Sequence, residues 1–305
     1  MVASVSIAGA GISCLDQIVR APQVNWGETG AVSEYFVQGG GLVATAMVAC
    51  ARLGACCELF SPLGDDFTGQ EIAKELVSEK VHLRLPLTPG GKSPFSFIHI
   101  DEHSGERTIF HRSSVGLATD LKKVDFSVIA TCGALLVDDI YPDMALAAAK
   151  AARAAGVPVV ADLIPNEKNR ELLQSVDVLI APRHYAQQLG LTDNLDAALA
   201  AIHRLGPTTA VIPLGTAGWV FSDPTGTGRG AAFPVEVVDT NGAGDTFHGA
   251  FAFGLAQGWE TARCAEFAAA AAALKCTRLG GRTGLPTLAQ AIAFLKARST
   301  QKWEL

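Results

Sequence analysis

Short runs of apolar, β-branched residues alternate with amphipathic stretches along most of this chain. ALLVDD at 134–139 precedes MALAAAKAARAAG, and VPVVADL precedes NRELLQSV, with glycine closing many of the helical segments. This rhythm predicts βαβ units built around a mostly parallel sheet with helices on both faces. A chain of 305 residues could hold one or two such α/β domains.

Two segments break the rhythm, at about residues 21–38 and 92–112. Both are richer in aromatic residues and alternate with a period of two, and DEHSGE forms a turn between the halves of the second. We expect these segments to be β-strands outside the main layer that pair into one small sheet. Such a sheet would form a lid over the carboxyl edge of the core sheet, where α/β folds bind ligands.

Composition and charge exclude several classes of protein. Apolar residues make up 49% of the chain and charged residues 18%, which suits a large core and argues against disorder. The net charge is −6 and no basic run appears, so we expect no nucleic-acid partner. No apolar run is long enough to span a membrane, and no Lys or Arg precedes Arg20 as in a signal peptide. We therefore expect a cytoplasmic protein with no membrane partner. Its seven cysteines contain no C-x-x-C pair, which argues against a disulfide framework and a zinc site.

Two glycine clusters are candidate ligand sites. The triplet GAG at 9–11 follows a strand-like run, as in dinucleotide-binding folds, but Cys14 stands where the third glycine belongs and no helix opens there. A nucleotide-dependent dehydrogenase stays open as an alternative. The second cluster, VEVVDTNGAGDTFHGAFAFGLAQG, is typical of a strand, a tight turn and a helix that is apolar nearly all round.

The turn in DTNGAGD places backbone N–H groups of Gly242, Ala243 and Gly244 at a helix N-terminus, which attracts anions. A carboxylate at Asp245 would repel a bound anion, so its presence there makes sense when the anion is a phosphoryl group in transfer. The N–H groups would then hold charge on its oxygens while the carboxylate takes the proton of an attacking hydroxyl. The alternative is that Asp245 only caps its helix. His248, three positions on, is expected to be a packed helix residue.

With GG at 40–41 before LVATAMVACARLGA and the late CTRLGG, the DTNGAGD segment resembles the ribokinase-like (PfkB) family of carbohydrate kinases. The resemblance covers essentially the whole chain and favours Asp245 as catalytic base. It implies one domain over residues 1–305, folded as a three-layer α/β/α sandwich with a β-sheet lid that often forms a homodimer interface. It also implies ATP, Mg²⁺ and often a monovalent cation such as K⁺.

The resemblance also implies a sugar site. Asp16 matches an Asp that binds sugar hydroxyls, and Gly40 and Gly41 match a glycine pair that lets the sugar approach the backbone. Thr45 stands where the family usually has Asn. Because a hydroxyl cannot replace both the donor and the acceptor of an amide, we expect this sugar contact to be altered.

The remaining residues implied by the resemblance concern ATP and ions. VIPLGTAGW matches the loop that faces ATP, and LKCTRLGGRTG matches the segment around adenine and the monovalent cation. The ATP residues are Gly215, Thr216, Gly218 and Lys275, and the cation would be held by backbone carbonyls of Asp239, Asn241, Lys275, Arg278 and Gly280. Many members carry N-x-x-E near Mg²⁺, but Ala181 and His184 stand at those places, and Asp162 is the nearest acidic substitute. The Mg²⁺ site therefore stays unassigned.

The glycine triplet before LVATA and the segment ALKCTRLGGRTGLP resemble the sulfofructose kinase branch of the family. A sulfonate needs cations, with Arg preferred. No Lys or Arg lies between Arg20 and Arg52, which leaves Lys92, Arg107 and Arg112 of the second lid segment. We therefore expect a neutral ketose or furanose, phosphorylated at a primary hydroxyl. The alternatives are a sulfofructose kinase, a nucleoside or deoxy-ketoacid kinase, and a protein that only binds a sugar or nucleotide.

Overall fold

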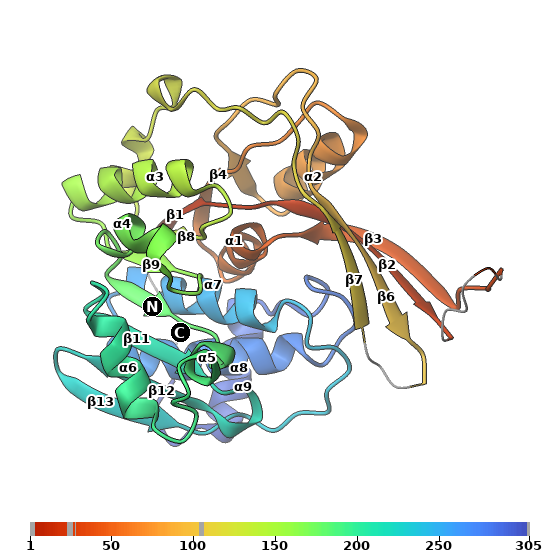
Figure 1. The fold of residues 1–305 in the computed structure, drawn as a ribbon. Coiled ribbons are helices and arrows are strands. Elements are labelled where there is room, and N and C mark those ends of the chain that lie inside the picture. The colour runs from red at the N-terminus through yellow and green to blue at the C-terminus, as the bar shows by residue number, and fades with distance from the viewer. Residues whose placement is uncertain (1–3, 23–26, 28, 104–106, 304–305) are drawn as a thin grey trace.

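The structure is a computed structural model that describes residues 4–22, 27, 29–103 and 107–303. Its main layer is a nine-stranded sheet (Figure 1), in which neighbouring strands from β11 to β5 are parallel and only β12 and β13 are antiparallel. In spatial order its strands are β13 (Gly226–Gly230), β12 (Trp219–Asp223), β11 (Thr209–Pro213), β10 (Val178–Ile180), β9 (Val159–Ala161), β8 (Ala134–Val137), β1 (Ser6–Ala10), β4 (Cys56–Phe60) and β5 (Val81–Leu83). The central strands β8, β9 and β10 are buried along their whole length, because parallel sheets are covered on both faces.

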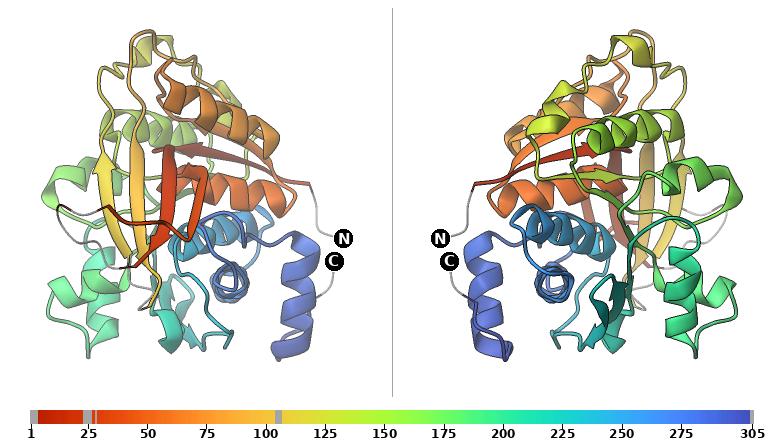
Figure 2. Two further views of the ribbon diagram at one scale, coloured as in Figure 1. Left: turned by 90° about the vertical axis from the view of Figure 1, so that its right-hand side faces the viewer. Right: turned by 90° about the vertical axis from the view of Figure 1, so that its left-hand side faces the viewer.

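Helices cover both faces of this sheet, each over its own apolar core (Figures 1 and 2). One face carries α1 (Leu42–Arg52), α2 (Phe67–Ser78), α7 (Ala243–Ala256), α8 (Thr261–Lys275) and α9 (Leu288–Arg298). The other carries α3 (Pro142–Ala154), α4 (Arg170–Leu173), α5 (Arg183–Gln188) and α6 (Leu195–His203). The predicted three-layer α/β/α sandwich is thereby confirmed. In the described part of the chain, no helix is long and apolar enough to span a membrane.

A separate four-stranded sheet forms the lid and projects from the core (Figures 1 and 2). Its order is β3 (Glu34–Gly40), β2 (Cys14–Ala21), β6 (Phe95–Asp101) and β7 (Arg107–Arg112). The expected second segment is confirmed, but the first was placed too late, because the lid already begins at Cys14. The short run from Gly11 to Ser13 carries the chain from core to lid, so CLDQIV within GISCLDQIV belongs to a lid strand. Residues 23–26, 28 and 104–106, including part of the expected DEHSGE turn, lie outside the described residues.

The expected strand in VEVVD is wrong. Residues 231–240 form no strand, and near α7 this segment is held by Val238 N and Asp239 N, which both donate to the Cys276 carbonyl. Among the described residues, no strand pairs with this segment to form a ladder. The helix that follows is buried along most of its length because it packs between α1, α8 and the sheet.

Candidate active site

The N-terminus of α7 starts with Gly242 as the N-cap residue, in the left-handed conformation with φ of +75°. A Cβ at this position would lie 2.5 Å from the Gly281 carbonyl oxygen. Both the backbone angle and the close approach therefore require glycine. Gly244, in contrast, has nothing within 4 Å of where its Cβ would be, so the chain is open toward solvent there.

The backbone donors at this helix end differ in part from expectation. Among the described residues, the N–H groups of Gly242 and Gly244 donate to no acceptor, which leaves them available to an anion. Ala243 does not match the prediction, because its N–H donates to the Thr240 carbonyl at 3.2 Å. The turn that positions the helix uses this third donor.

The Asp245 carboxylate lies in the first turn of α7 and is half-buried. Within the described chain it accepts no hydrogen bond, neither from the helix start nor from another side chain, so the geometry does not support the capping alternative. Burial raises the pKa of Asp245 well above its ordinary value, the charges of Asp162 and Asp16 raise it further, and Arg282 and Lys275 oppose the rise.

Asp162 directly follows β9, at the carboxyl edge of the sheet. Its Oδ1 is 3.4 Å from Nε2 of His248 on α7. The His248 ring also lies 2.8 Å from the Gly244 carbonyl and 3.0 Å from the Ile180 carbonyl, so it is a packed helix residue. Burial raises the pKa of Asp162, against the effect of His248. The charge of Asp162 acts on Asp245, and Asp162 adds a carboxylate to the carboxyl edge of the sheet.

Asp16 projects from β2 next to the start of α1. A Cβ on Gly40 would lie 2.3 Å from Asp16 Oδ2, so only glycine leaves room for this carboxylate against the backbone. The Cys14 thiol donates to Asp16 at 3.3 Å. Gly41 follows as the N-cap of α1. The structure thus brings Asp16, Gly40 and Gly41 together, on a lid strand rather than at the end of the first core strand.

A buried arginine behind Asp16 and the glycine pair does not appear among the residues expected from the sequence. Arg282 is 2% exposed, and its guanidinium donates to the Gly40 carbonyl at 3.0 Å and to Glu75 at 3.1 Å. It also donates to the Thr45 hydroxyl at 3.2 Å. Thr45 is buried, so the structure places it behind the glycine pair as a partner of Arg282 rather than at the cleft. Arg282 follows the noted CTRLGG segment, but only the folded chain brings it to Gly40.

The turn after residue 238 is held by Asp239. Its carboxylate accepts from Asn241 N at 2.8 Å and Gly280 N at 2.8 Å, which joins this turn to the loop after α8. The structure therefore brings together most segments of the expected cation site. However, the Lys275 ammonium donates to the Asp239 carbonyl oxygen at 2.8 Å.

This ammonium decides whether a monovalent cation fits. Two monovalent cations that share one oxygen lie about 5 Å apart, and at an effective dielectric of about 20 they repel each other by about 3 kcal/mol. A cation held by the Asp239 carbonyl would meet that repulsion from Lys275. The donor set therefore does not fit K⁺ as the resemblance implies.

The expected ATP loop follows β11. Gly215 begins the 3₁₀ turn η4 (Gly215–Ala217), in which Thr216 is exposed, and the Gly218 carbonyl accepts from Leu214 N at 2.7 Å. Because β1, β8, β9, β10 and β11 are parallel, this loop and Asp162 lie at the same sheet edge.

The residues at the places of the family's N-x-x-E do not form a Mg²⁺ site. Ala181 is buried after β10 and His184 is exposed on α5. No cluster of three or more His, Cys, Asp or Glu side chains among the described residues could hold a metal ion alone. Mg²⁺ is commonly held by one or two carboxylates together with substrate phosphates, and Asp162 fits that need.

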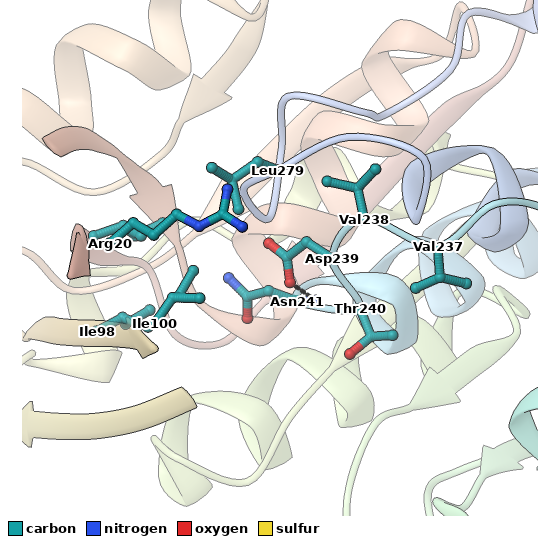
Figure 3. A pocket seen from close by; sticks show the side chains of 10 residues that line it. Arg20, Ile98, Ile100, Val237, Val238, Asp239, Thr240, Asn241 and Leu279 are labelled. Atoms are coloured by element: carbon teal, nitrogen blue, oxygen red, sulfur yellow. Dashed lines mark hydrogen bonds between the residues drawn. The ribbon is translucent and has the colours of Figure 1, made fainter. Parts of the chain in front are cut away.

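The lid closes over the Asp239 turn around a pocket of about 300 Å³ (Figure 3). Ile98, Ile100 and Leu279 form apolar walls, and the Arg20 side chain extends toward Asp239 and Asn241. Arg20 Nε is buried without a hydrogen-bond partner among the described residues. The expectation that the first lid strands contribute no cation is therefore wrong, since the strand start at Cys14 places Arg20 in β2. The Nη1 group of Arg20 pairs with Glu34 at 3.3 Å on the neighbouring lid strand. Arg112 pairs with Asp66 at 3.4 Å, and the Arg107 side chain lies outside the described part of the chain.

The glycines of the GAG triplet at 9–11 allow close packing inside the protein and do not form a dinucleotide-binding turn. A Cβ on Gly9 would lie 2.8 Å from the Met47 side chain, and one on Gly11 would lie 2.4 Å from Asp138. The chain then continues into the lid strand and not into a helix.

Comparison with known proteins agrees with this geometry. The model of the pfkB family carbohydrate kinases matches residues 7–288, and the chain belongs to this family. The expected carbohydrate kinase is confirmed, and the dehydrogenase alternative is wrong. The chain is similar to the ribokinase of Haemophilus influenzae, with 29% identity over 92% of this chain and 95% of that protein. It is 27% identical to an ATP-dependent ribose-1-phosphate kinase of Halopiger xanaduensis, over 92% of this chain and 99% of that protein. Arabidopsis thaliana ribokinase complexed with ribose and ATP superposes with a TM-score of 0.84 at 25% identity, over 96% and 99% of the two chains.

Proposed function

We propose that this protein transfers the γ-phosphoryl group of ATP to a primary hydroxyl of a ketose or furanose sugar, with Asp245 as general base. One observation carries the proposal: the Asp245 carboxylate lies at a helix end beside the N–H groups of Gly242 and Gly244, and none of these groups has a hydrogen-bond partner among the described residues. A base and an anion site side by side are what transfer of a phosphoryl group to a hydroxyl requires. The names of the ribokinase relatives favour a pentofuranose.

In this mechanism Asp16 accepts hydrogen bonds from sugar hydroxyls, and the backbone at Gly40 and Gly41 lets the ring approach closely. Asp245 takes the proton of the attacking hydroxyl while the new O–P bond forms. The bond from the γ-phosphorus to the β–γ bridging oxygen breaks, and ADP leaves. The N–H groups at the start of α7 stabilise the negative charge on the transferred group.

The loop with Gly215, Thr216 and Gly218 would bind the nucleotide, as the resemblance implies. Asp162 would hold Mg²⁺, which neutralises phosphate charge when bound.

The direct test is to replace the carboxylate of Asp245 by an amide, which cannot accept the proton. Asp245→Asn should lower kcat by at least about a hundredfold, because general-base help contributes that much or more. ATP affinity, measured by calorimetry, should persist because the helix end remains. Asp196→Asn is the matched control, since it removes a carboxylate from the first turn of α6, away from the site. Wild-type turnover in Asp245→Asn would contradict the base assignment.

Arg20 supports a second candidate substrate class, a sugar that carries an additional anionic group. Its guanidinium lines the pocket under the lid, and one relative is named a ribose-1-phosphate kinase. Sulfofructose belongs to the same class. A screen for ADP release with ribose, fructose, nucleosides, deoxy-ketoacids, ribose-1-phosphate and sulfofructose separates the candidates.

Arg20→Met refines the screen. If the substrate is a sugar with an additional anionic group, Arg20→Met should lower the ratio of kcat/KM for the charged sugar to kcat/KM for the neutral sugar. The expected decrease is about ten- to a hundredfold, because a charge-assisted hydrogen bond is lost. An unchanged ratio would leave the neutral sugar as substrate.

The outer face of the lid supports the expected homodimer. Val37, Gln17, Phe97 and Phe110 are direct cross-strand neighbours in one row. Tyr35 is 58% exposed, Phe110 56% and Val37 45%, which makes an apolar surface opposite the face on which Ile18 and Ile98 are buried. We propose that a second copy of the chain covers this surface.

A further inference from the structure

Lys275 is the last residue of α8 and has 0% relative exposure. A lysine is almost never fully buried without compensation, because its charge loses the stabilisation of water. The compensation here includes the Asp239 carbonyl oxygen at 2.8 Å from Nζ and the negative end of the α8 helix. The fold therefore holds a positive charge inside the protein at one defined place.

That place lies where two segments of the site meet. The Asp239 carboxylate joins the turn before α7 to the loop after α8 through Asn241 N and Gly280 N. The same turn leads to Gly242 and to the free donors of the helix start. The charge of Lys275 also reaches Asp245, on which it acts electrostatically. The ammonium thus supports, from behind, the turn that holds the anion site.

We propose that the Lys275 ammonium is a built-in replacement for a monovalent cation, and that this kinase works without K⁺. The Asp239 carbonyl, which would ligate such a cation, binds the ammonium instead. Because the positive charge is covalently attached, it is present at any concentration of K⁺. The kinetic consequence rests on the proposed sugar kinase activity, whereas the binding consequence does not.

The first experiment uses the unmodified protein in KCl, NaCl or choline chloride at equal ionic strength. Turnover and kcat/KM should agree within twofold across the three salts. The melting temperature should show no increase specific to K⁺ over choline. A saturable activation of fivefold or more by K⁺, or a saturable K⁺-specific rise in melting temperature, would overturn the proposal. If no sugar is phosphorylated, the function proposal fails while the melting series still decides the ion question.

The second experiment creates the missing site. Lys275→Ala removes the ammonium and leaves space beside the Asp239 carbonyl. In choline chloride, kcat/KM should fall at least tenfold, and KCl should restore part of it. Lys275→Met fills the space without charge and should lose activity without recovery in KCl. Lys296→Met, an exposed lysine in the last turn of α9, is the matched control and should behave like wild type.

Full activity of Lys275→Ala in choline chloride would overturn the proposal, as would a loss that KCl does not reverse. If the variant does not fold, the salt series on the unmodified protein remains the deciding measurement.

Discussion

Asp245 combines two properties that a general base for phosphoryl transfer needs. Its carboxylate makes no hydrogen bond within the described chain, so it is available to a substrate hydroxyl. Its pKa is raised well above the ordinary value, first by burial and then by the charges of Asp162 and Asp16. A higher pKa makes the carboxylate a stronger proton acceptor while it stays ionised at sufficiently high pH.

This environment predicts a pH profile. A base must be unprotonated, so kcat/KM should rise with pH through the raised pKa of Asp245. Asp162→Asn removes a like charge, which should lower that pKa and move the acidic limb of the profile to lower pH. Kinetics from pH 5 to 9 would measure the shift.

Asp143→Asn is a suitable control, because it removes an exposed carboxylate from the first turn of α3. If the acidic limb of the kcat/KM profile stays in place in Asp162→Asn, or moves to higher pH, the electrostatic coupling between Asp162 and Asp245 is contradicted.

Contacts between elements hold the site together. Gly242 allows the turn before α7 to pass against the Gly281 backbone, and Arg282 joins α1, α2 and the end of β3 through Thr45, Glu75 and Gly40. The loop after α8 therefore contacts both the helix start at Gly242 and the glycine pair beside Asp16. A disturbance of this loop should affect both.

Gly242→Ala tests the contact at the turn. The left-handed backbone costs a non-glycine residue about 1–2 kcal/mol, and the new Cβ must also displace the Gly281 carbonyl. We expect the free energy of unfolding to fall by more than about 2 kcal/mol, and kcat to fall because the donors move. Urea denaturation and steady-state kinetics measure the two effects.

Gly258→Ala provides the comparison, since Gly258 has the same φ of +75° but nothing within 4 Å of its Cβ position. It should lose only the backbone contribution and keep its activity. Equal losses in the two variants would show that the contact with Gly281 has no energetic effect.

The proposed assembly of two copies of the chain would depend on the lid. One lid face is buried over the cleft by Ile18, Ile98 and Ile100, and the opposite face exposes Tyr35, Val37 and Phe110. Contact between two lids would cover these residues and stiffen the strands that carry Asp16 and Arg20.

Phe110→Glu should therefore convert a dimer into a monomer in sedimentation equilibrium, because a charge at the centre of an apolar interface is costly. Val77→Glu is the control, as Val77 is 71% exposed on α2, outside the lid. A wild-type protein that is monomeric at micromolar concentration would contradict lid-mediated assembly.

Local patterns in the sequence were sufficient to predict much of this protein. The alternation of apolar runs and amphipathic stretches predicted the layered sheet, and DTNGAGD predicted the glycine turn with Asp245 at a helix start. Both depend on backbone propensities and periods within a few neighbouring residues. The strand expected at VEVVD is wrong because a strand depends on more than local pattern. It needs a hydrogen-bonding partner strand, which its own residues do not supply.

Only the tertiary structure decided which side chains meet. Arg282 binds Gly40 across 242 positions of sequence, and Lys275 reaches Asp239 across 36. It also moved the lid boundary to Cys14, which brought Arg20 into the site. Charge and hydrogen-bond partners of a buried side chain depend on distances between remote segments, and these distances exist only once the layers have packed. The sequence by itself therefore determined the architecture and placed the Asp245 carboxylate at a helix start, whereas the packed chain determined which cationic side chains lie around them.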